Sequence, residues 1–130
     1  MAIITKRPRN SSLRFQTYLD NSDITKKAPE KSLVYGLRKH GGRNAYGRIT
    51  VRHRGGGAYQ KYRMIDFKRT DRDVAGTITA VEYDPNRNVR IGLVYFINGA
   101  KKYILLPEGL SVGSTVMAGE NVEAKTGNCL

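Results

Sequence analysis

The chain has 130 residues, a formal net charge of +12 and 39% hydrophobic residues, and this length allows one small domain with extensions rather than two full domains. The low apolar fraction suits a core of roughly 60–70 residues with basic arms attached. The excess of cations implies an acidic partner, nucleic acid first and an anionic membrane surface second, but no apolar run approaches the roughly 20 residues of a membrane-spanning helix.

All of the net positive charge lies in the first 73 residues. Residues 1–73 contain 18 Lys and Arg against 6 Asp and Glu, whereas residues 74–130 contain 5 of each kind. This division is typical of a protein that lies against a polyanion and anchors itself with a compact module. The single cysteine, Cys129, excludes an internal disulfide and favours a reducing compartment.

Residues 1–37 lack sustained periodicity, and we interpret them as an extension that becomes ordered on its partner. Its first 15 residues are basic and contain no acid. A transit peptide is also compatible with that composition, but a basic arm is the interpretation that we prefer. Residues 21–30 are predicted to form a loop or turn.

Residues 38–57 combine six Lys or Arg residues, six glycines and no acid. Within them, Arg48–Arg52 alternates basic or polar with apolar side chains, which predicts a short strand. Tyr59–Arg69 alternates more clearly and predicts a longer strand, which is followed by a turn at residues 70–73.

From residue 74 onward, short apolar segments alternate with turn residues, and no segment has convincing helical periodicity. Asn98-Gly99 is a strong hairpin signal, and Asp84-Pro-Asn-Arg87 predicts a tight turn. The predicted strands are Gly76–Tyr83, Arg90–Phe96, Lys101–Leu106, Ser114–Met117 and Val122–Ala124. This spacing predicts a small all-β barrel or sandwich, most economically closed as five strands, but it does not separate an OB-fold from an SH3-like barrel.

The basic, glycine-rich segment at residues 38–57 predicts a contact with nucleic acid. Arginine offers planar, forked donors to phosphate, and glycine lets the main chain approach a sugar–phosphate backbone. Four tyrosines in or beside the segment could stack on unpaired bases: Tyr35, Tyr46, Tyr59 and Tyr62. A solvated basic loop is the alternative, but the absence of any acid from Arg38 to Met64 favours nucleic acid.

Other kinds of site find little support in the sequence. Gly55-Gly-Gly57 lacks the Gly-Lys-Ser/Thr ending and the following helix of a phosphate-binding loop. His40, His53 and Cys129 lack metal-ligand spacing, so we predict no metal and no other cofactor. No acid–base or nucleophilic constellation indicates an enzyme. Arg87 is well placed for a phosphate, with an exposed turn arginine as the alternative.

Five ordered motifs resemble a known family. They are Gly41-Gly-Arg-Asn-Ala-Tyr-Gly-Arg-Ile-Thr50, Arg52-His-Arg-Gly-Gly-Gly57, Tyr62-Arg-Met-Ile-Asp-Phe-Lys-Arg69, Glu82-Tyr-Asp-Pro-Asn-Arg87 and Lys102-Tyr-Ile-Leu-Leu-Pro-Glu-Gly-Leu110. From roughly Lys31 to Leu130 the chain resembles the N-terminal half of the bacterial-type large-subunit ribosomal protein L2 family. The resemblance implies an all-β fold, in which a small OB-fold barrel over residues 59–130 follows a long basic extension over residues 1–58 that penetrates rRNA.

The resemblance also implies that Arg87 and the basic extension contact rRNA. With the cations predicted from the pattern, the candidate RNA-binding residues are Arg38, Lys39, Arg43, Arg48, Arg52, His53, Arg54, Lys61, Arg63, Lys68, Arg69, Arg87 and Arg90. The implied function is that of a structural, non-enzymatic constituent of the large ribosomal subunit, which binds 23S-type rRNA beside neighbouring ribosomal proteins and supports assembly and translation. A free OB-fold factor that binds single-stranded RNA is the alternative, and a protein-binding adaptor is a second one.

The family continues past a Gly-Asn-x-Leu segment, here Gly127-Asn-Cys-Leu130, into an SH3-like domain and a tail rich in Gly and His. We expect either a separate chain that carries this SH3-like half, as in some organelles, or a truncation. The expected location is the ribosome, in the mitochondrion if the protein is naturally split and otherwise in the bacterial cytoplasm or a plastid, with no membrane role.

Overall fold

The computed structural model describes residues 3–26 and 28–129, so Met1, Ala2, Lys27 and Leu130 of the predicted extension and barrel lie outside the described residues. No α-helix occurs in the described part, and none of its helices is long and apolar enough to cross a membrane. The elements are β1 Ile3–Thr5, η1 Ser11–Leu13, β2 Thr17–Leu19, η2 Lys31–Leu33, β3 Val34–Leu37, β4 Gln60–Arg63, β5 Gly76–Glu82, β6 Ile91–Phe96, β7 Lys101–Leu105 and β8 Thr115–Val116, where η denotes a 3-10 helix.

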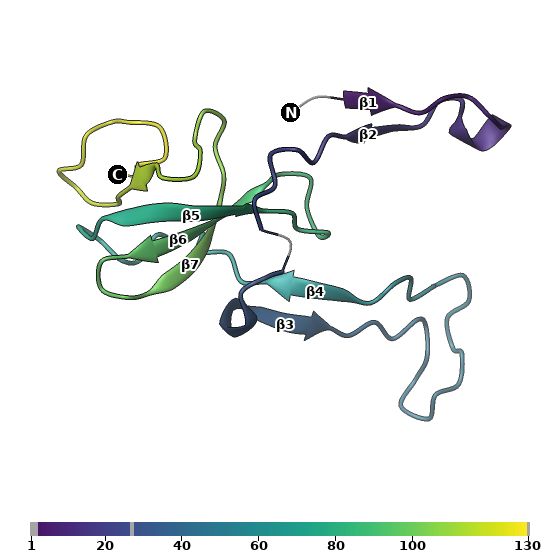
Figure 1. Ribbon diagram of the computed structural model, residues 1–130. Coiled ribbons are helices and arrows are strands. Elements are labelled where there is room, and N and C mark those ends of the chain that lie inside the picture. Colours follow the sequence, from purple (N-terminus) through teal and green to yellow (C-terminus); the bar gives the residue numbers. More distant parts are fainter. Residues whose placement is uncertain (1–2, 27, 130) are drawn as a thin grey trace.

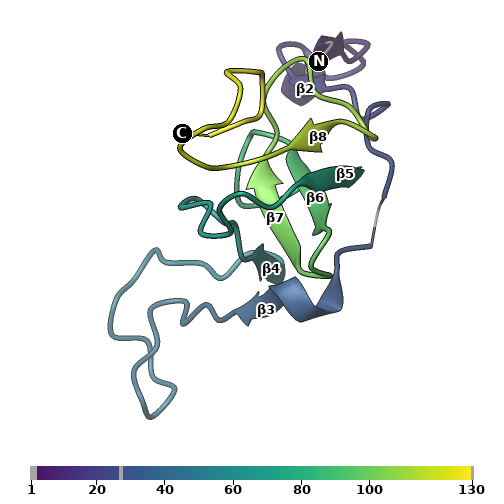
Figure 2. The ribbon, with the colours of Figure 1, turned by 90° about the vertical axis from the view of Figure 1, so that its left-hand side faces the viewer.

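The central antiparallel sheet has the strand order β7–β6–β5–β8 (Figure 1). The β6–β7 hairpin turns where predicted, at Asn98-Gly99, with a φ of 82° at Gly99. Beyond β4, Ile65 forms a parallel bridge to Tyr103, which brings the chain to the β7 edge of the sheet. The result is a curled half-barrel (Figure 2), and the prediction of an all-β fold is confirmed.

Apolar side chains cover both faces of this sheet. One cluster contains Ile78, Val94, Phe96, Ile104 and Val116, and the other contains Ala80, Ile91, Leu93 and Tyr103. Residues two apart on a strand normally share a face, but a bulge in β5 between Ile78 and Ala80 assigns them to different clusters. Val34 of β3 and Ile65 pack against the second cluster, so the base of the β3–β4 hairpin is attached to the sheet by apolar contact.

Predicted strands in the half-barrel are confirmed as β5, β6, β7 and β8, whereas two other predicted strands are wrong. Residues 48–52 form no strand, because the chain reverses through turns there and leaves only a bridge between Arg43 and Ile49. Residues 122–124 lie in a loop, and pairing occurs later, where Cys129 bridges Ala118.

The strand predicted over residues 59–69 is shorter than expected. It comprises β4 alone, and the chain beyond it bends where the Asp66 carboxylate accepts a hydrogen bond of 2.9 Å from the N–H of Arg69, whose φ is 48°. Conversely, the sequence did not predict β1, β2 or β3, all of which lie within residues 1–37. β1 pairs with β2, and β3 pairs with β4.

Candidate nucleic-acid interface

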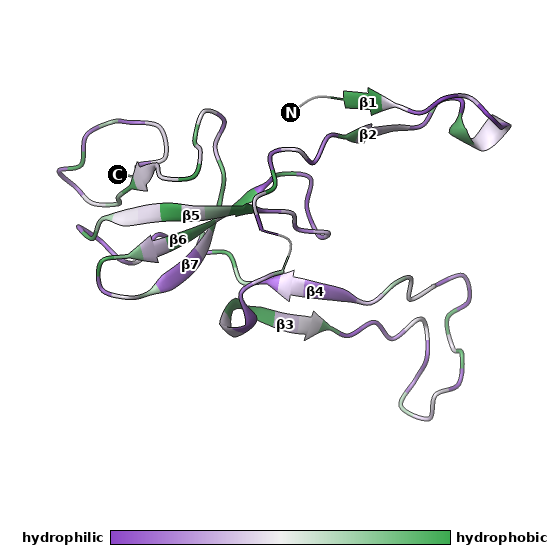
Figure 3. Cartoon of the chain, viewed as in Figure 1, coloured by the Kyte–Doolittle hydropathy of each residue, from purple (hydrophilic) through white to green (hydrophobic). Residues whose placement is uncertain are grey.

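Two hairpins extend away from the half-barrel (Figure 1). One is made by β1 and β2, and the other by β3 and β4, which are joined by a long segment of residues 38–59 that we call the distal loop. Figure 3 shows hydrophilic residues along β4 and at intervals along the distal loop. The hairpins therefore carry polar surface away from the core.

The distal loop is organised by turns that satisfy its own backbone. The Asn44 carboxamide oxygen accepts hydrogen bonds of 3.0 Å from the N–H groups of Tyr46 and Arg48. The Gly42 carbonyl accepts from the N–H of Val51 at 3.2 Å. Gly42 has a φ of 73°, and a Cβ there would collide with the Val51 carbonyl, so this turn requires glycine. These bonds use backbone groups and the Asn44 carboxamide, and the long side chains of the arginines remain exposed.

Every candidate RNA-binding residue of the distal loop is exposed. These residues are Arg38, Lys39, Arg43, Arg48, Arg52, His53 and Arg54. Lys39 donates to the Ala58 carbonyl at 3.2 Å, and Arg43 donates to the Gly41 carbonyl at 2.8 Å. Within residues 3–26 and 28–129, none of the seven has a carboxylate within salt-bridge distance. Uncompensated charge of one sign on a protruding loop attracts a polyanion.

An aromatic and cationic stack connects the β3–β4 hairpin to the half-barrel. Tyr35 and Tyr62 are cross-strand partners whose ring centroids lie 5.1 Å apart, and the Arg87 guanidinium lies 5.6 Å from the Tyr62 centroid. Tyr35 remains 51% exposed. Two of the tyrosines singled out in the sequence are therefore brought together with the arginine of the Asp-Pro-Asn turn.

Arg87 is held by the turn that precedes it. Its Nε donates to the Asp84 carboxylate at 2.6 Å, and Asp84 is fully buried. The same carboxylate accepts from the N–H of Asn86 at 3.0 Å, as predicted for an Asp that starts a turn. Burial disfavours the charged form of Arg87, but its contacts with Asp84 and Tyr62 outweigh burial and raise its pKa. Arg87 is thus a positioned, partly exposed cation rather than a free turn arginine.

Arg63 and Arg90 are buried, with 7% and 3% of their surface exposed. The Arg90 guanidinium donates to both carboxylate oxygens of Asp23 at 3.1 Å and to the Asp20 carbonyl at 2.6 Å. Arg63 donates to the Lys61 carbonyl at 3.2 Å and lies 3.7 Å from the Asp84 carboxylate. Both side chains are therefore engaged in contacts within the protein: Arg90 with Asp23, and Arg63 with Asp84. Contact between either of them and RNA stays a prediction.

The remaining candidates lie in two places. Lys61 is exposed on β4, beside the distal loop. Lys68 and Arg69 instead line a small cavity of about 30 Å³ with Arg72, Ala118, Gly119 and Cys129. The structure therefore gathers Lys61 and the distal-loop cations on one hairpin, places Arg87 of the β5–β6 turn against Tyr62 of that hairpin, and separates Lys68 and Arg69 from them.

The candidate residues omitted a second exposed basic hairpin. β1, β2 and the turn between them carry exposed Lys6, Arg7, Arg9 and Arg14, and Phe15 is 89% exposed. The sequence signal was present, because the first 15 residues are basic without acids. In the described part of the chain, no group of three or more His, Cys, Asp or Glu side chains could hold a metal ion.

A half-barrel of antiparallel strands that displays uncompensated cations, glycines and tyrosines on a protruding hairpin defines a nucleic-acid-binding module. A family model described as ribosomal proteins L2, RNA binding N-terminal domain, matches residues 30–118. The chain therefore belongs to the family of ribosomal L2 N-terminal RNA-binding domains. This membership confirms the resemblance, the OB-like fold, binding of ribosomal RNA and the prediction that the protein is not an enzyme.

Proposed function

We propose that this protein is a structural constituent of the large ribosomal subunit, where it binds 23S-type rRNA and supports subunit assembly and translation. The observation that carries the proposal is the distal loop, whose exposed cations have no acidic partner among the described residues. Family membership supports the same conclusion, because the matched span contains the whole distal loop.

In this proposal, residues 1–58 form the rRNA-penetrating extension and residues 59–130 form the OB-fold domain. The β3–β4 pair crosses that boundary and connects the two parts through hydrogen bonds between strands. The RNA-binding role is assigned to the exposed candidates first, which are the distal-loop cations and Lys61, together with the partly exposed Arg87.

The mechanism is neutralisation of packed phosphates. Each Lys or Arg that contacts a phosphate displaces condensed counterions, and side chains at the end of the half-barrel follow the shape of the RNA. If about 4–8 cations between Arg38 and Arg63 contact phosphates, log affinity falls with log salt concentration with a slope of about −3 to −6, from the single-strand coefficient.

The test is binding of the full chain to large-subunit rRNA fragments over a range of salt concentrations. A slope near −3 to −6, with a preference for folded rRNA fragments, supports the proposal. A slope near zero contradicts it. Equal binding to any single-stranded RNA favours the alternative, a free single-strand-binding OB-fold factor.

We further propose that neighbouring ribosomal proteins contact the half-barrel and that a separate chain supplies the SH3-like half. With such a division the compartment is the mitochondrion, and without it the compartment is the bacterial cytoplasm or a plastid. Mass spectrometry of purified large subunits tests this, because a split protein requires a second polypeptide with the SH3-like sequence.

A further inference from the structure

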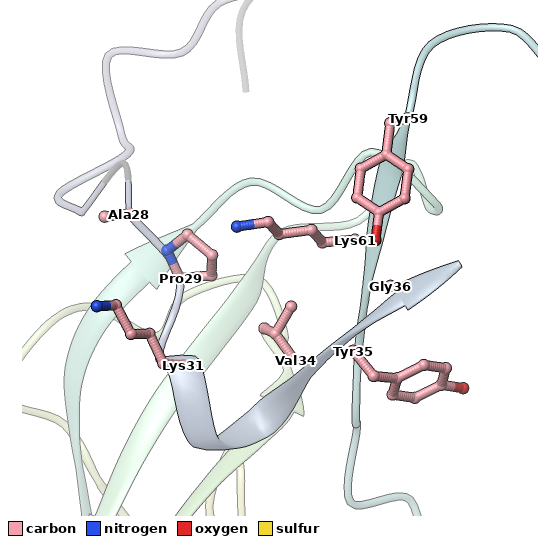
Figure 4. Close-up of a pocket in the computed structure, with 8 residues that line it drawn as sticks. All are labelled: Ala28, Pro29, Lys31, Val34, Tyr35, Gly36, Tyr59 and Lys61. Carbon is pink, nitrogen blue, oxygen red and sulfur yellow. The ribbon is translucent and has the colours of Figure 1, made fainter. Parts of the chain in front are cut away.

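Two adjoining cavities open beside Tyr59, and Tyr59 lines both of them. The first, about 250 Å³, is lined by residues that include Pro29, Lys31, Val34, Gly36, Tyr59 and Lys61, and we call it the Tyr59 pocket (Figure 4). The second, about 520 Å³, is lined by residues that include Arg38, Lys39, His40, Gly56, Gly57 and Tyr59. Apolar groups contribute to both walls, joined by Lys31 and Lys61 in the first cavity and by Arg38, Lys39 and the Gly56-Gly57 backbone in the second.

The wall of the Tyr59 pocket has the character of a stacking surface. Tyr59 is 72% exposed, although it is a large aromatic residue. Its hydroxyl lies over Gly36, where an added Cβ would collide with it. Figure 4 shows Tyr59 and Pro29 on opposite sides of the pocket, with Val34 and Lys61 between them, while the Tyr35 ring points away. The Tyr59 ring is seen face on in Figure 4 and turns its edge toward Pro29, so a flat ligand would stack on the ring face rather than between Tyr59 and Pro29.

The charge around both cavities is positive. Lys31 and Lys61 are exposed, and neither has a carboxylate within salt-bridge distance in the described part. Glu30 is the nearest acid in sequence, but its carboxylate lies 3.5 Å from the Lys26 amine and 3.6 Å from the Lys101 amine. Among the described residues, no acid lines either cavity. The occupant is therefore expected to be anionic as well as flat.

The size of the pocket fits one ring system. A volume of about 250 Å³ is several times the roughly 30 Å³ that a water molecule occupies. It lies below the roughly 300–1,000 Å³ of pockets that enclose drug-sized ligands. A single nucleobase is a flat ligand of intermediate size that stacks on exposed tyrosines, and its backbone supplies the negative charge.

We propose that the Tyr59 pocket receives one unpaired nucleobase of RNA, stacked on Tyr59, and that the adjoining cavity holds the neighbouring phosphates. Lys61 and Lys31 flank the base, and Arg38, Lys39 and the Gly56-Gly57 backbone face the phosphates. The inference rests on the proposed RNA-binding function and adds to it a subsite for an extruded base. It therefore predicts that the protein distinguishes RNA with an unpaired base from fully paired RNA, which phosphate contacts alone do not do.

The test uses the full chain and two RNA hairpins that differ only in a single bulged 2-aminopurine, which one of them carries. The wild-type chain is expected to bind the bulged hairpin about fivefold or more tightly, from the lower end of base–aromatic stacking energies, and to change the fluorescence of 2-aminopurine. Tyr59→Ala is expected to abolish the preference, which is measured as the ratio of the two dissociation constants so that any change common to both hairpins cancels. Tyr59→Phe retains the preference, because the ring remains.

Tyr46→Ala is the matched control, since Tyr46 is 90% exposed in the same loop and lines neither cavity. The inference is overturned if the wild-type chain binds both hairpins equally, or if Tyr59→Ala and Tyr46→Ala lower the preference equally. In either case the proposed function stands, provided that binding to the paired hairpin keeps its steep salt dependence. If the wild-type chain shows no steep salt dependence, both the base subsite and the proposed function are overturned.

Discussion

Removal of three distal-loop arginines is predicted to weaken RNA binding without weakening the fold. The variant is the triple substitution Arg48→Gln, Arg52→Gln and Arg54→Gln. All three residues are exposed, and their side chains form no hydrogen bond or salt bridge within the described part of the chain. Surface substitutions of this kind change stability by roughly 0.5 kcal/mol or less each. The thermal midpoint is therefore expected to stay within a few degrees.

The magnitude follows from counterion release. Loss of three phosphate contacts reduces the salt slope by about 2 on single-stranded RNA and by about 3 on a duplex, and it lowers affinity about 100-fold at roughly 0.1 M salt. Fluorescence anisotropy with a labelled rRNA fragment at several salt concentrations measures both quantities.

The matched control removes the same charge from the half-barrel. Arg72→Gln, Lys101→Gln and Lys125→Gln replace cations that already lie 3.4, 3.6 and 2.6 Å from carboxylates of Glu120, Glu30 and Glu123. Its salt slope is predicted to match the wild type. Equal slopes for the two triple variants would refute the assignment of phosphate contacts to the distal loop, because net charge alone would then explain binding.

Three further predictions concern the structure that carries these side chains. Arg90→Ala is expected to lower the free energy of unfolding by about 2 kcal/mol, because a buried guanidinium and its bonds to Asp23 are lost. Urea unfolding measures this change, and a loss below about 0.5 kcal/mol would contradict the prediction. Burial raises the pKa of Glu82 above 4.5 despite the opposing contacts of Tyr103 and Lys26, so the folded state binds the proton more tightly. The contribution of Glu82 to stability therefore falls as pH rises above about 4.5, and Glu82→Gln should flatten the dependence in urea unfolding from about pH 4 to 8. Gly42→Ala should disrupt the turn and weaken RNA binding, because its φ of 73° and the Val51 carbonyl oppose a side chain there. The thermal midpoint is expected to fall only slightly, because the exposed distal loop contributes no residue to the two apolar clusters. Wild-type affinity would show that this turn does not position the cations.

The half-barrel was predictable because its signals are local. Gly76–Glu82 and Ile91–Phe96 are rich in residues that favour strands, and Asn98-Gly99 forms the turn that fixes the register of the β6–β7 hairpin. The strand at Val34–Leu37 was missed because its stability comes from pairing with Gln60–Arg63, across a loop that carries no periodic pattern. Two short strands near the N-terminus have every residue exposed, so no burial pattern marks them.

The candidate site was predictable as a region and less so residue by residue. The acid-free sequence around the distal-loop cations predicted a basic surface there, and the structure shows these cations exposed. Burial of Arg90 depends on Asp23, which is 67 positions away, and this pairing leaves no trace in local spacing. The same holds for Arg63 beside Asp84. Composition located the cations, whereas long-range pairing decided which of them remain at the surface.

The most direct measurement is sedimentation of an extract from the source organism through a high-salt sucrose gradient, with mass spectrometry of each fraction. Co-migration of this chain with the large ribosomal subunit at high salt is the predicted result, and a second polypeptide with an SH3-like sequence in the same fractions would support the division into two chains. Recovery of the chain at the top of the gradient, free of rRNA, would contradict the assignment to the large subunit.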